Sequence, residues 1–334
     1  MISFLRYQKR VLRLFLALVP LLLLTGGGLA FAVLNTTTNN TEPVRIYLPQ
    51  SDVALDARDT LIATGLVDDG PMFKLMADML KLDGQWHVGS YVVEPHTPLY
   101  RLIKRITRGQ QDPIRLTIGK FRLPQDLNQY LDTKLMHNDF NVTLDSFHLI
   151  LPDTYEVYWT INPEQFMQRM EDEYNRFWTT EVGPQGELRC DLLELSDNGN
   201  ARLETMILAS IVDEETNNNA EKPLIASVYL NRLKRGMPLQ ADPTVKYAVG
   251  DFTLRRILNK HLEVESPFNT YLHTGLPPAP ICLPSKATID AVLNAPETQY
   301  IYFCASEKLD GTHRFAATLA EHNRNAARYH AAIR

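Results

Sequence analysis

Three consecutive acidic residues, Asp213, Glu214 and Glu215, are the strongest candidates for chemistry in this sequence. They end the segment from Ala201 to Glu215, in which the spacing of apolar residues predicts a helix. Because helical residues advance by about 100° each, Glu215 is expected at the centre of the apolar face, Asp213 nearly opposite and Glu214 on the flank. The apolar face consists of Ile207, Leu208, Ile211 and Val212.

A carboxyl group in an apolar wall loses hydration, which penalises the anion and raises the pKa. A raised pKa is what a general acid needs near neutral pH. Glu215 is therefore the predicted catalytic residue. The alternative is a structural ion pair between Glu215 and a buried lysine or arginine, and the helix alone leaves both interpretations open.

Two later segments mix amides, carboxylates and aromatic rings in a way that suits a sugar-binding groove. In the loop that begins at Gly236, Gln240 and Asp242 lie between apolar residues. The second segment is the loop from Phe268 to Ile281, with further aromatic and imidazole side chains. Each residue alone is as readily a cap or a loop contact, and Asp-Pro at 242 is also a good start for a helix.

The sequence does not predict a metal site. His313 and His322 are nine residues apart, which is not a helical i, i+4 pair, and no carboxylate completes a known zinc pattern with them. The three cysteines, Cys190, Cys282 and Cys304, contain no C-x-x-C pair. One pair of them could form a disulfide in an oxidising compartment.

Composition narrows the class of protein. The 334 residues carry 34 Lys and Arg against 39 Asp and Glu, and the first 13 residues hold four basic residues and no acid. The rest of the chain is therefore more acidic than the net charge of −5 indicates. An acidic body argues against a nucleic acid as partner, because phosphate binding needs a basic surface. A hydrophobic content of 45% excludes wholesale disorder.

The N-terminal region predicts a membrane anchor. Leu14 to Leu34 has no charged residue, and about 20 apolar residues suffice for a transmembrane helix. The basic tail, residues 1–13, is expected in the cytoplasm. A polar stalk, residues 35–42, then leads into a part outside the cytoplasmic membrane. The alternative is a cleaved signal peptide, for which small residues such as Gly28 and Ala30 offer a cleavage site.

The elements that must position the acids indicate a mixed α+β fold. Residues 43–110 alternate short strand-like and helical segments and are interpreted as a small module, which either binds glycan or acts as a spacer. Residues 111–334 are expected to form the catalytic domain. Its main expected elements are a strand at Ile114–Ile118, helices at Leu123–Leu135, Pro163–Trp178, Ala201–Glu215 and Lys222–Lys234, a strand at Tyr300–Ala305 and a helix from Leu319.

Several long runs in this order resemble the MltG/YceG-like family of endolytic murein transglycosylases. The runs are Ala209-Ser-Ile-Val-Asp-Glu-Glu-Thr, Ala226-Ser-Val-Tyr-Leu-Asn-Arg-Leu, Gly236-Met-Pro-Leu-Gln-Ala-Asp-Pro-Thr-Val, Asn269-Thr-Tyr-Leu-His-Thr-Gly-Leu-Pro-Pro, Gly311-Thr-His-Arg-Phe and Glu321-His-Asn. The resemblance also covers the layout, with a single N-terminal anchor and a LysM-like module before the YceG-like catalytic domain.

The resemblance implies a lyase that cuts the β-1,4 bond between N-acetylmuramic acid and N-acetylglucosamine within peptidoglycan strands, leaving 1,6-anhydro ends. It assigns catalysis to Glu215, without a cofactor, and places Asp213 where the family has a glutamate. It implies substrate contacts by Arg232, Gln240, Asp242, Asn269, Thr270, Tyr271 and His313. Cell-wall synthases are the implied partners, at an inner membrane with the catalytic domain outside the cytoplasm.

Two other functions remain open. A peptidoglycan hydrolase would need a second carboxylate near Glu215, and Asp242 is the candidate. A membrane-tethered glycan-binding protein without activity would use Glu215 only structurally.

Overall fold

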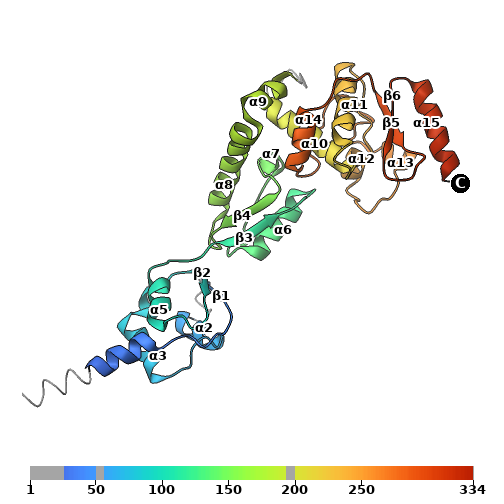
Figure 1. Cartoon of the computed structure of the whole chain (residues 1–334). Coiled ribbons are helices and arrows are strands. Elements are labelled where there is room, and N and C mark those ends of the chain that lie inside the picture. The colour runs from blue at the N-terminus through green and yellow to red at the C-terminus, as the bar shows by residue number, and fades with distance from the viewer. Residues whose placement is uncertain (1–25, 50–55, 193–199, 334) are drawn as a thin grey trace, which may run out of the picture. The chain divides into compact units, whose positions relative to one another are not determined.

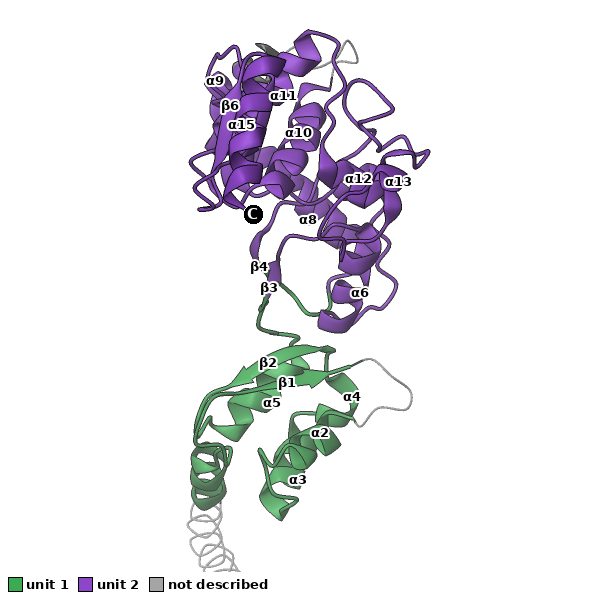
Figure 2. Ribbon diagram, turned by 90° about the vertical axis from the view of Figure 1, so that its right-hand side faces the viewer, with its two compact units in different colours: residues 1–115, 156–160 green, residues 116–155, 161–334 purple. Residues whose placement is uncertain are grey.

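The computed structural model of the chain describes residues 26–49, 56–192 and 200–333 (Figure 1). They form two compact units (Figure 2). Unit 1 runs to residue 115 and takes in residues 156–160, and unit 2 comprises residues 116–155 and 161–334. The domain limits expected from the sequence remain predictions, because a compact unit need not be a domain that folds alone.

Unit 1 is built on a two-stranded antiparallel sheet in which Ile46 lies opposite Tyr91. Alternation along the first strand buries Ile46 and Leu48 and leaves Arg45 and Tyr47 exposed, as expected for a sheet with one packed face. Helices cover the packed face with residues such as Leu102. The elements are β1 (Val44–Leu48), α2 (Ala57–Ala63), α3 (Pro71–Met79), α4 (Leu82–Gln85), β2 (Gly89–Val93) and α5 (Leu99–Thr107).

Unit 2 is mostly helical. Its elements, with strand β3 beginning just before the unit boundary, are β3 (Ile114–Ile118), α6 (Pro124–Lys134), α7 (Leu144–Phe147), β4 (Asp153–Val157), α8 (Pro163–Arg176), the π-helix η1 (Phe177–Val182), α9 (Gly183–Leu192), α10 (Ala201–Glu215), α11 (Lys222–Lys234), α12 (Asp242–Val249), α13 (Asn259–Leu262), α14 (Lys286–Leu293), β5 (Tyr302–Ala305), β6 (His313–Ala316) and α15 (Leu319–Ala332). Strands β3 and β4 pair with each other, and β5 pairs antiparallel with β6.

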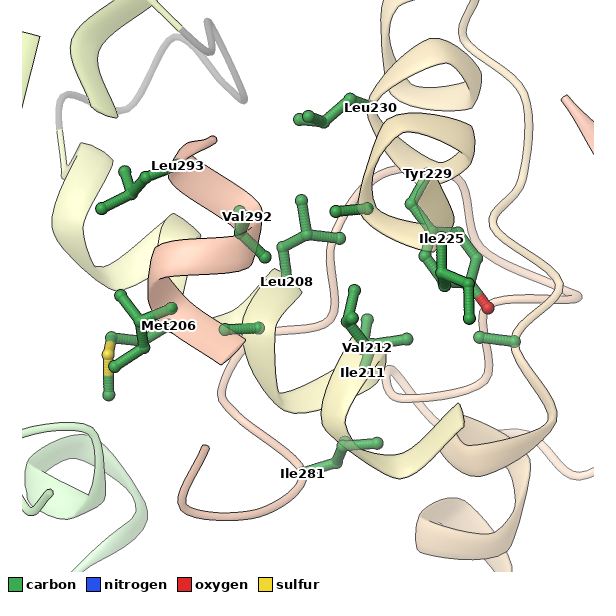
Figure 3. Packing of buried hydrophobic residues seen from close by; sticks show 14 of the residues in the cluster. Met206, Leu208, Ile211, Val212, Ile225, Tyr229, Leu230, Ile281, Val292 and Leu293 are labelled. Atoms are coloured by element: carbon green, nitrogen blue, oxygen red, sulfur yellow. The ribbon is translucent and has the colours of Figure 1, made fainter. Parts of the chain in front are cut away.

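The core of unit 2 is centred on α10. Figure 3 shows Leu208, Ile211 and Val212 of this helix between residues of α11 and α14, among them Ile225 and Val292. Asn200 begins the helix by accepting a hydrogen bond from the backbone N–H of Leu203. The helix that carries the three acids is thus the most enclosed element of its unit.

The predicted membrane-spanning helix is not found in the described chain. The basic tail and residues 14–25 of the expected span lie outside the described residues. The chain is helical from 26 to 35, but none of the described helices is both long and apolar enough to cross a membrane. The fold prediction is wrong in this feature, although the mixed α+β class holds.

The LysM-like part of the fold prediction is also not shown. A two-stranded sheet with helices on one face is a common arrangement, and a fold alone does not assign glycan binding.

The segment expected as a stalk packs on this unit. Thr38 is 1% exposed and donates its backbone N–H to the carbonyl of Thr97, and Thr37 forms a β-bridge with Pro98.

Candidate active site

The three acids lie at the C-terminal end of α10, but not on the faces that helical spacing predicted. The helix is buried on all sides from Glu204 to Asp213, because α11 and α14 both pack against it. Asp213, expected opposite the packed face, is only 6% exposed. Burial by itself therefore does not distinguish Glu215 from its neighbours. The three carboxylates differ in the residues with which they form hydrogen bonds and ion pairs.

Asp213 is neutralised by lysines. Its Oδ1 accepts a hydrogen bond from Lys222 Nζ at 2.6 Å and one from the hydroxyl of Thr288, and Lys120 Nζ lies 3.3 Å from Oδ2. Burial raises the pKa of Asp213, but the bonds from Lys222 and Thr288 and the charge of Lys120 outweigh it. The pKa therefore lies below its ordinary value, and Asp213 is a structural anion.

Glu214 is held by a segment far upstream. Lys120 Nζ lies 2.8 Å from one carboxylate oxygen, and Arg122 donates to the other at 3.0 Å. Lys120 also donates to the backbone carbonyl of Asp213 at 2.7 Å. Cations are favourable at a helix C-terminus, where the last carbonyls lack partners. This segment therefore fixes the helix end from which Glu215 projects.

Glu215 has a different environment. Its side chain is half-buried, and among the described residues no lysine or arginine forms an ion pair with it. Burial raises the pKa of Glu215 to about 7, and the charge of Asp242 acts in the same direction. The hydrogen bond from Tyr229 and the charge of Lys246 oppose this rise. The pKa rise predicted from the sequence is present, and Glu215 is the one acid of the three suited to proton transfer near neutral pH.

Tyr229 is the residue that sequence reasoning missed. It projects from α11, is 1% exposed and donates its hydroxyl to Glu215 Oε1 at 2.5 Å. Figure 3 shows its ring beside Ile225 in the core, and it also packs edge-on against Phe303, with ring centroids 5.9 Å apart. One signal was available, because a buried tyrosine needs a partner for its hydroxyl. The partner itself lies on another helix and could not be read from spacing.

Helix α12 brings two charged groups into the electrostatic field of Glu215. Asp242 begins this helix and Lys246 follows four residues later, so both lie on one side of it. Asp242 is exposed and accepts a hydrogen bond from the hydroxyl of Tyr271 at 2.7 Å. Burial, followed by this bond and the charges of Asp242 and Glu215, raises the pKa of Tyr271. The structure thus brings Glu215, Asp242 and Tyr271 into one electrostatic cluster.

Asn269 and Thr270, predicted to contact substrate, form hydrogen bonds within the surrounding loops. Asn269 is fully buried and donates its amide to the carbonyls of Leu262 and Val264. The Thr270 hydroxyl accepts from the backbone N–H of Ala241. These bonds involve the side-chain amide of Asn269 and the hydroxyl of Thr270. A substrate role for either residue stays a prediction.

Gln240 and Arg232 are linked to each other. Gln240 is exposed, has a positive φ of 50° and accepts a weak hydrogen bond from Arg232 at 3.4 Å. Arg232 is 8% exposed and donates to the carbonyls of Ile301 and Leu239. Arg232 therefore braces the loop that precedes α12.

His313 lies on β6 and pairs with Glu221, with Nδ1 2.9 Å from the carboxylate. Its ring packs on Phe303, the same residue that contacts Tyr229. Its link to Glu215 therefore runs through two intervening rings. Over the described ranges, no group of three or more His, Cys, Asp or Glu is arranged to hold a metal ion, and the expectation of a metal-free, cofactor-free site stays a prediction.

A model of the YceG-like family matches residues 46–328, most of the chain. The chain belongs to the YceG-like family. The match includes unit 1 from residue 46 onward. The YceG-like resemblance stated from the motifs is confirmed.

Two curated relatives with a named activity are similar to part of the chain. The chain is 45% identical over 124 residues to an endolytic murein transglycosylase of Bacillus subtilis, covering 37% of the chain and 34% of that relative. It is 32% identical over 130 residues to an endolytic murein transglycosylase of Streptococcus pneumoniae, covering 38% and 23%. The aligned part is thus about a third and about a quarter of these relatives' lengths.

A crystal structure of a yceG-like protein from Listeria monocytogenes has a TM-score of 0.52 with 24% identity, covering 85% of this chain and 99% of that one. At this identity the likeness concerns the fold.

Proposed function

We propose that the protein is an endolytic murein transglycosylase that cuts the β-1,4 bond between N-acetylmuramic acid and N-acetylglucosamine within peptidoglycan strands. The observation that carries the proposal is the contrast within the acid run. Asp213 and Glu214 are paired with lysine and arginine, whereas Glu215 is desolvated, bonded to a neutral hydroxyl and has a pKa raised to about 7. The relatives' activity and the family match support the same reading.

One carboxyl group can serve both halves of this reaction. Neutral Glu215 donates its proton to the glycosidic oxygen, the C1–O bond breaks and its electron pair stays on the leaving oxygen. The muramic C6 hydroxyl then attacks C1, and its proton passes to the Glu215 carboxylate. The product is a 1,6-anhydro end, no water is consumed, and the enzyme returns to its starting protonation state.

Peptidoglycan hydrolysis is the second candidate, and a specific observation favours it. Asp242 is an exposed carboxylate whose charge acts on Glu215. Glycosidases use such a pair, with the second carboxylate acting as nucleophile or as base for a water. Only the product distinguishes the two reactions, because hydrolysis leaves a reducing muramic end.

The proposed substrate also indicates where in the cell the protein acts. Peptidoglycan lies outside the cytoplasm, so we expect the site to act there. Cutting within a strand ends or releases it, and cell-wall synthases, which make these strands, are the partners that we propose.

The test is mass spectrometry of the fragments that the full chain makes from purified glycan strands. Anhydro ends from the wild type and none from Glu215→Gln support the proposal, and Glu214→Gln is the matched control on the same helix end. Reducing ends from the wild type select hydrolysis, and intact strands after prolonged incubation reject both enzymes.

A further inference from the structure

The two oxygens of the Glu215 carboxyl group are not equivalent. Oε1 accepts the Tyr229 hydroxyl at 2.5 Å. For Oε2, no hydrogen-bond donor is found within the described part of the chain. A neutral carboxyl group carries its proton on one of its two oxygens. The hydrogen bond that Oε1 accepts from Tyr229 therefore bears on which oxygen carries it.

Tyr229 donates its hydroxyl hydrogen to Oε1. Burial, with the charge of Glu215 adding to it, raises the pKa of Tyr229 well above its ordinary value, so the phenol keeps its proton at any pH at which Glu215 titrates. With the phenol hydrogen directed at Oε1, the carbonyl-type acceptor of neutral Glu215 is favoured at Oε1 and its proton at Oε2.

Both partners are held in place. Tyr229 is 1% exposed and is fixed by α11 and by the ring of Phe303. Glu215 is the last residue of α10, and the ion pairs of Asp213 and Glu214 hold that end of the helix. A carboxyl group anchored between two such elements cannot rotate freely to exchange its oxygens.

We propose that Tyr229 is a positioning residue that reserves Oε1 of Glu215, so that Oε2 alone gives the proton to the glycosidic oxygen and takes it back from the attacking hydroxyl. This inference rests on the proposed function. In the first half-step the Oε2–H bond breaks as the leaving oxygen gains the proton. In the second, the C6 oxygen bonds to C1 and its proton returns to Oε2, while Tyr229 keeps its own proton throughout.

Other charged and titratable groups act on this pair from several elements. Asp242 and Lys246 of α12 and Glu214 of α10 act on Glu215. Arg232 and Tyr271 act on Tyr229. Since none of them donates a hydrogen bond to Oε1, the loss of the Tyr229 hydroxyl is not replaced by a neighbour.

The test compares Tyr229→Phe with Tyr155→Phe. Tyr155 is also a buried tyrosine, 6% exposed, whose hydroxyl donates to the carbonyl of Leu151 at 2.6 Å. Both variants lose one buried hydrogen bond and keep the ring. Two quantities are measured on the full chain: the pH profile of kcat/KM for anhydro-product formation, and the titration of the Glu215 carboxyl by 13C NMR, assigned with Glu215→Gln.

We expect Tyr229→Phe to lower kcat about 10- to 100-fold, because a misplaced catalytic group costs that much. Its Glu215 titration and the basic limb of its profile should move up by about one to two pH units, the worth of one hydrogen bond to the anion. Tyr155→Phe should change neither. Equal behaviour of the two variants in the NMR titration and in kcat overturns the proposal.

Should Tyr229→Phe fail to fold, 3-fluorotyrosine at position 229 replaces it. Its more acidic phenol is a stronger donor, so the Glu215 titration should move to lower pH, and an unmoved titration overturns the proposal. A wild type that forms no anhydro product rejects the proposed function, whereas the NMR titration still decides whether Tyr229 holds Oε1.

Discussion

Asp213 and Lys222 form an ion pair at 2.6 Å in which both side chains are only 7% exposed. A buried ion pair was the structural alternative considered for Glu215, and the structure assigns it to the residue two positions earlier. The pairing explains how three adjacent carboxylates tolerate one crowded helix end, because Asp213 and Glu214 are compensated by cations and Glu215, whose pKa is raised to about 7, can be neutral.

The first prediction concerns this pair. Lys222→Met should lower the free energy of unfolding by about 3–5 kcal/mol, because it leaves a buried carboxylate uncompensated. Chemical denaturation at neutral pH measures the change. The matched control is Lys74→Met, whose partner Asp69 is 54% exposed. Exposed pairs contribute about 0–1 kcal/mol, so similar losses in the two variants would contradict the assignment.

The same pair predicts a pH dependence with a definite sign. The folded pKa of Asp213 is lowered, so its stabilising contribution is fully present above its ordinary pKa of about 4. It is lost as the pH falls through the folded pKa. The stability difference between wild type and Asp213→Asn should therefore shrink on acidification below about pH 4.

The second prediction is that Glu215→Gln remains folded and binds glycan strands while turnover falls at least about a thousandfold. A positioned acid or base contributes about 10²–10⁴-fold, and Glu215 is used in both half-steps. Glu214→Gln should lose far less activity, although it loses the ion pairs with Lys120 and Arg122. Near-normal turnover by Glu215→Gln would exclude its catalytic role.

The third prediction uses the opposite effects of Asp242 and Lys246 on the pKa of Glu215. Neutral Glu215 is the proton donor, so kcat/KM should fall as the pH rises above about 7. Asp242 raises this pKa, so Asp242→Asn should move the basic limb to lower pH. Lys246 lowers it, so Lys246→Met should move the limb to higher pH.

The pH profiles of these two variants against wild type provide the measurement. At low pH Glu215 is neutral in both proteins, so Asp242→Asn should turn over at close to the wild-type rate there and differ from it only above the pKa of Glu215. A complete loss of turnover in Asp242→Asn would instead support the hydrolase, in which Asp242 takes part in the chemistry.

The helix that carries the acids could be predicted because its signals are local. The bounds of α10 and α11 agree with those read from the sequence, helped by Asn200 at the start of one and Pro223 in the first turn of the other. Helix α12 lies within the expected loop, and only its start at Asp242-Pro243 was indicated by the sequence, although the left-handed Gly250 that ends it is an ordinary stop signal. Short elements between loops have too few residues to show a period.

The surroundings of the acids could not be predicted, because they are set by residues distant in sequence. Lys120 is 93 positions before Asp213, and Tyr229 reaches Glu215 from another helix. Helical spacing assigns residues to faces of a helix but cannot show that every face is covered. It therefore predicted an exposed Asp213, which is in fact only 6% exposed.

The last prediction concerns the upstream segment that holds the helix end. Lys120 bridges Asp213 and Glu214 and also bonds the backbone carbonyl of Asp213. Lys120→Met should lower kcat by about tenfold, because Glu215 would lose its fixed orientation without losing its chemistry. The loss of stability should be smaller than for Lys222→Met, since Lys120 is 34% exposed and Lys222 and Arg122 still compensate the two carboxylates. Lys286→Met is the matched control, because that lysine pairs with Asp153 and Glu181 and not with the acid run. Steady-state rates and denaturation midpoints of both variants measure the effects on kcat and on stability. Equal kcat for the two would show that the clamp on Asp213 and Glu214 does not position Glu215, whereas a large loss of stability in Lys120→Met would show that Lys120 acts mainly in folding.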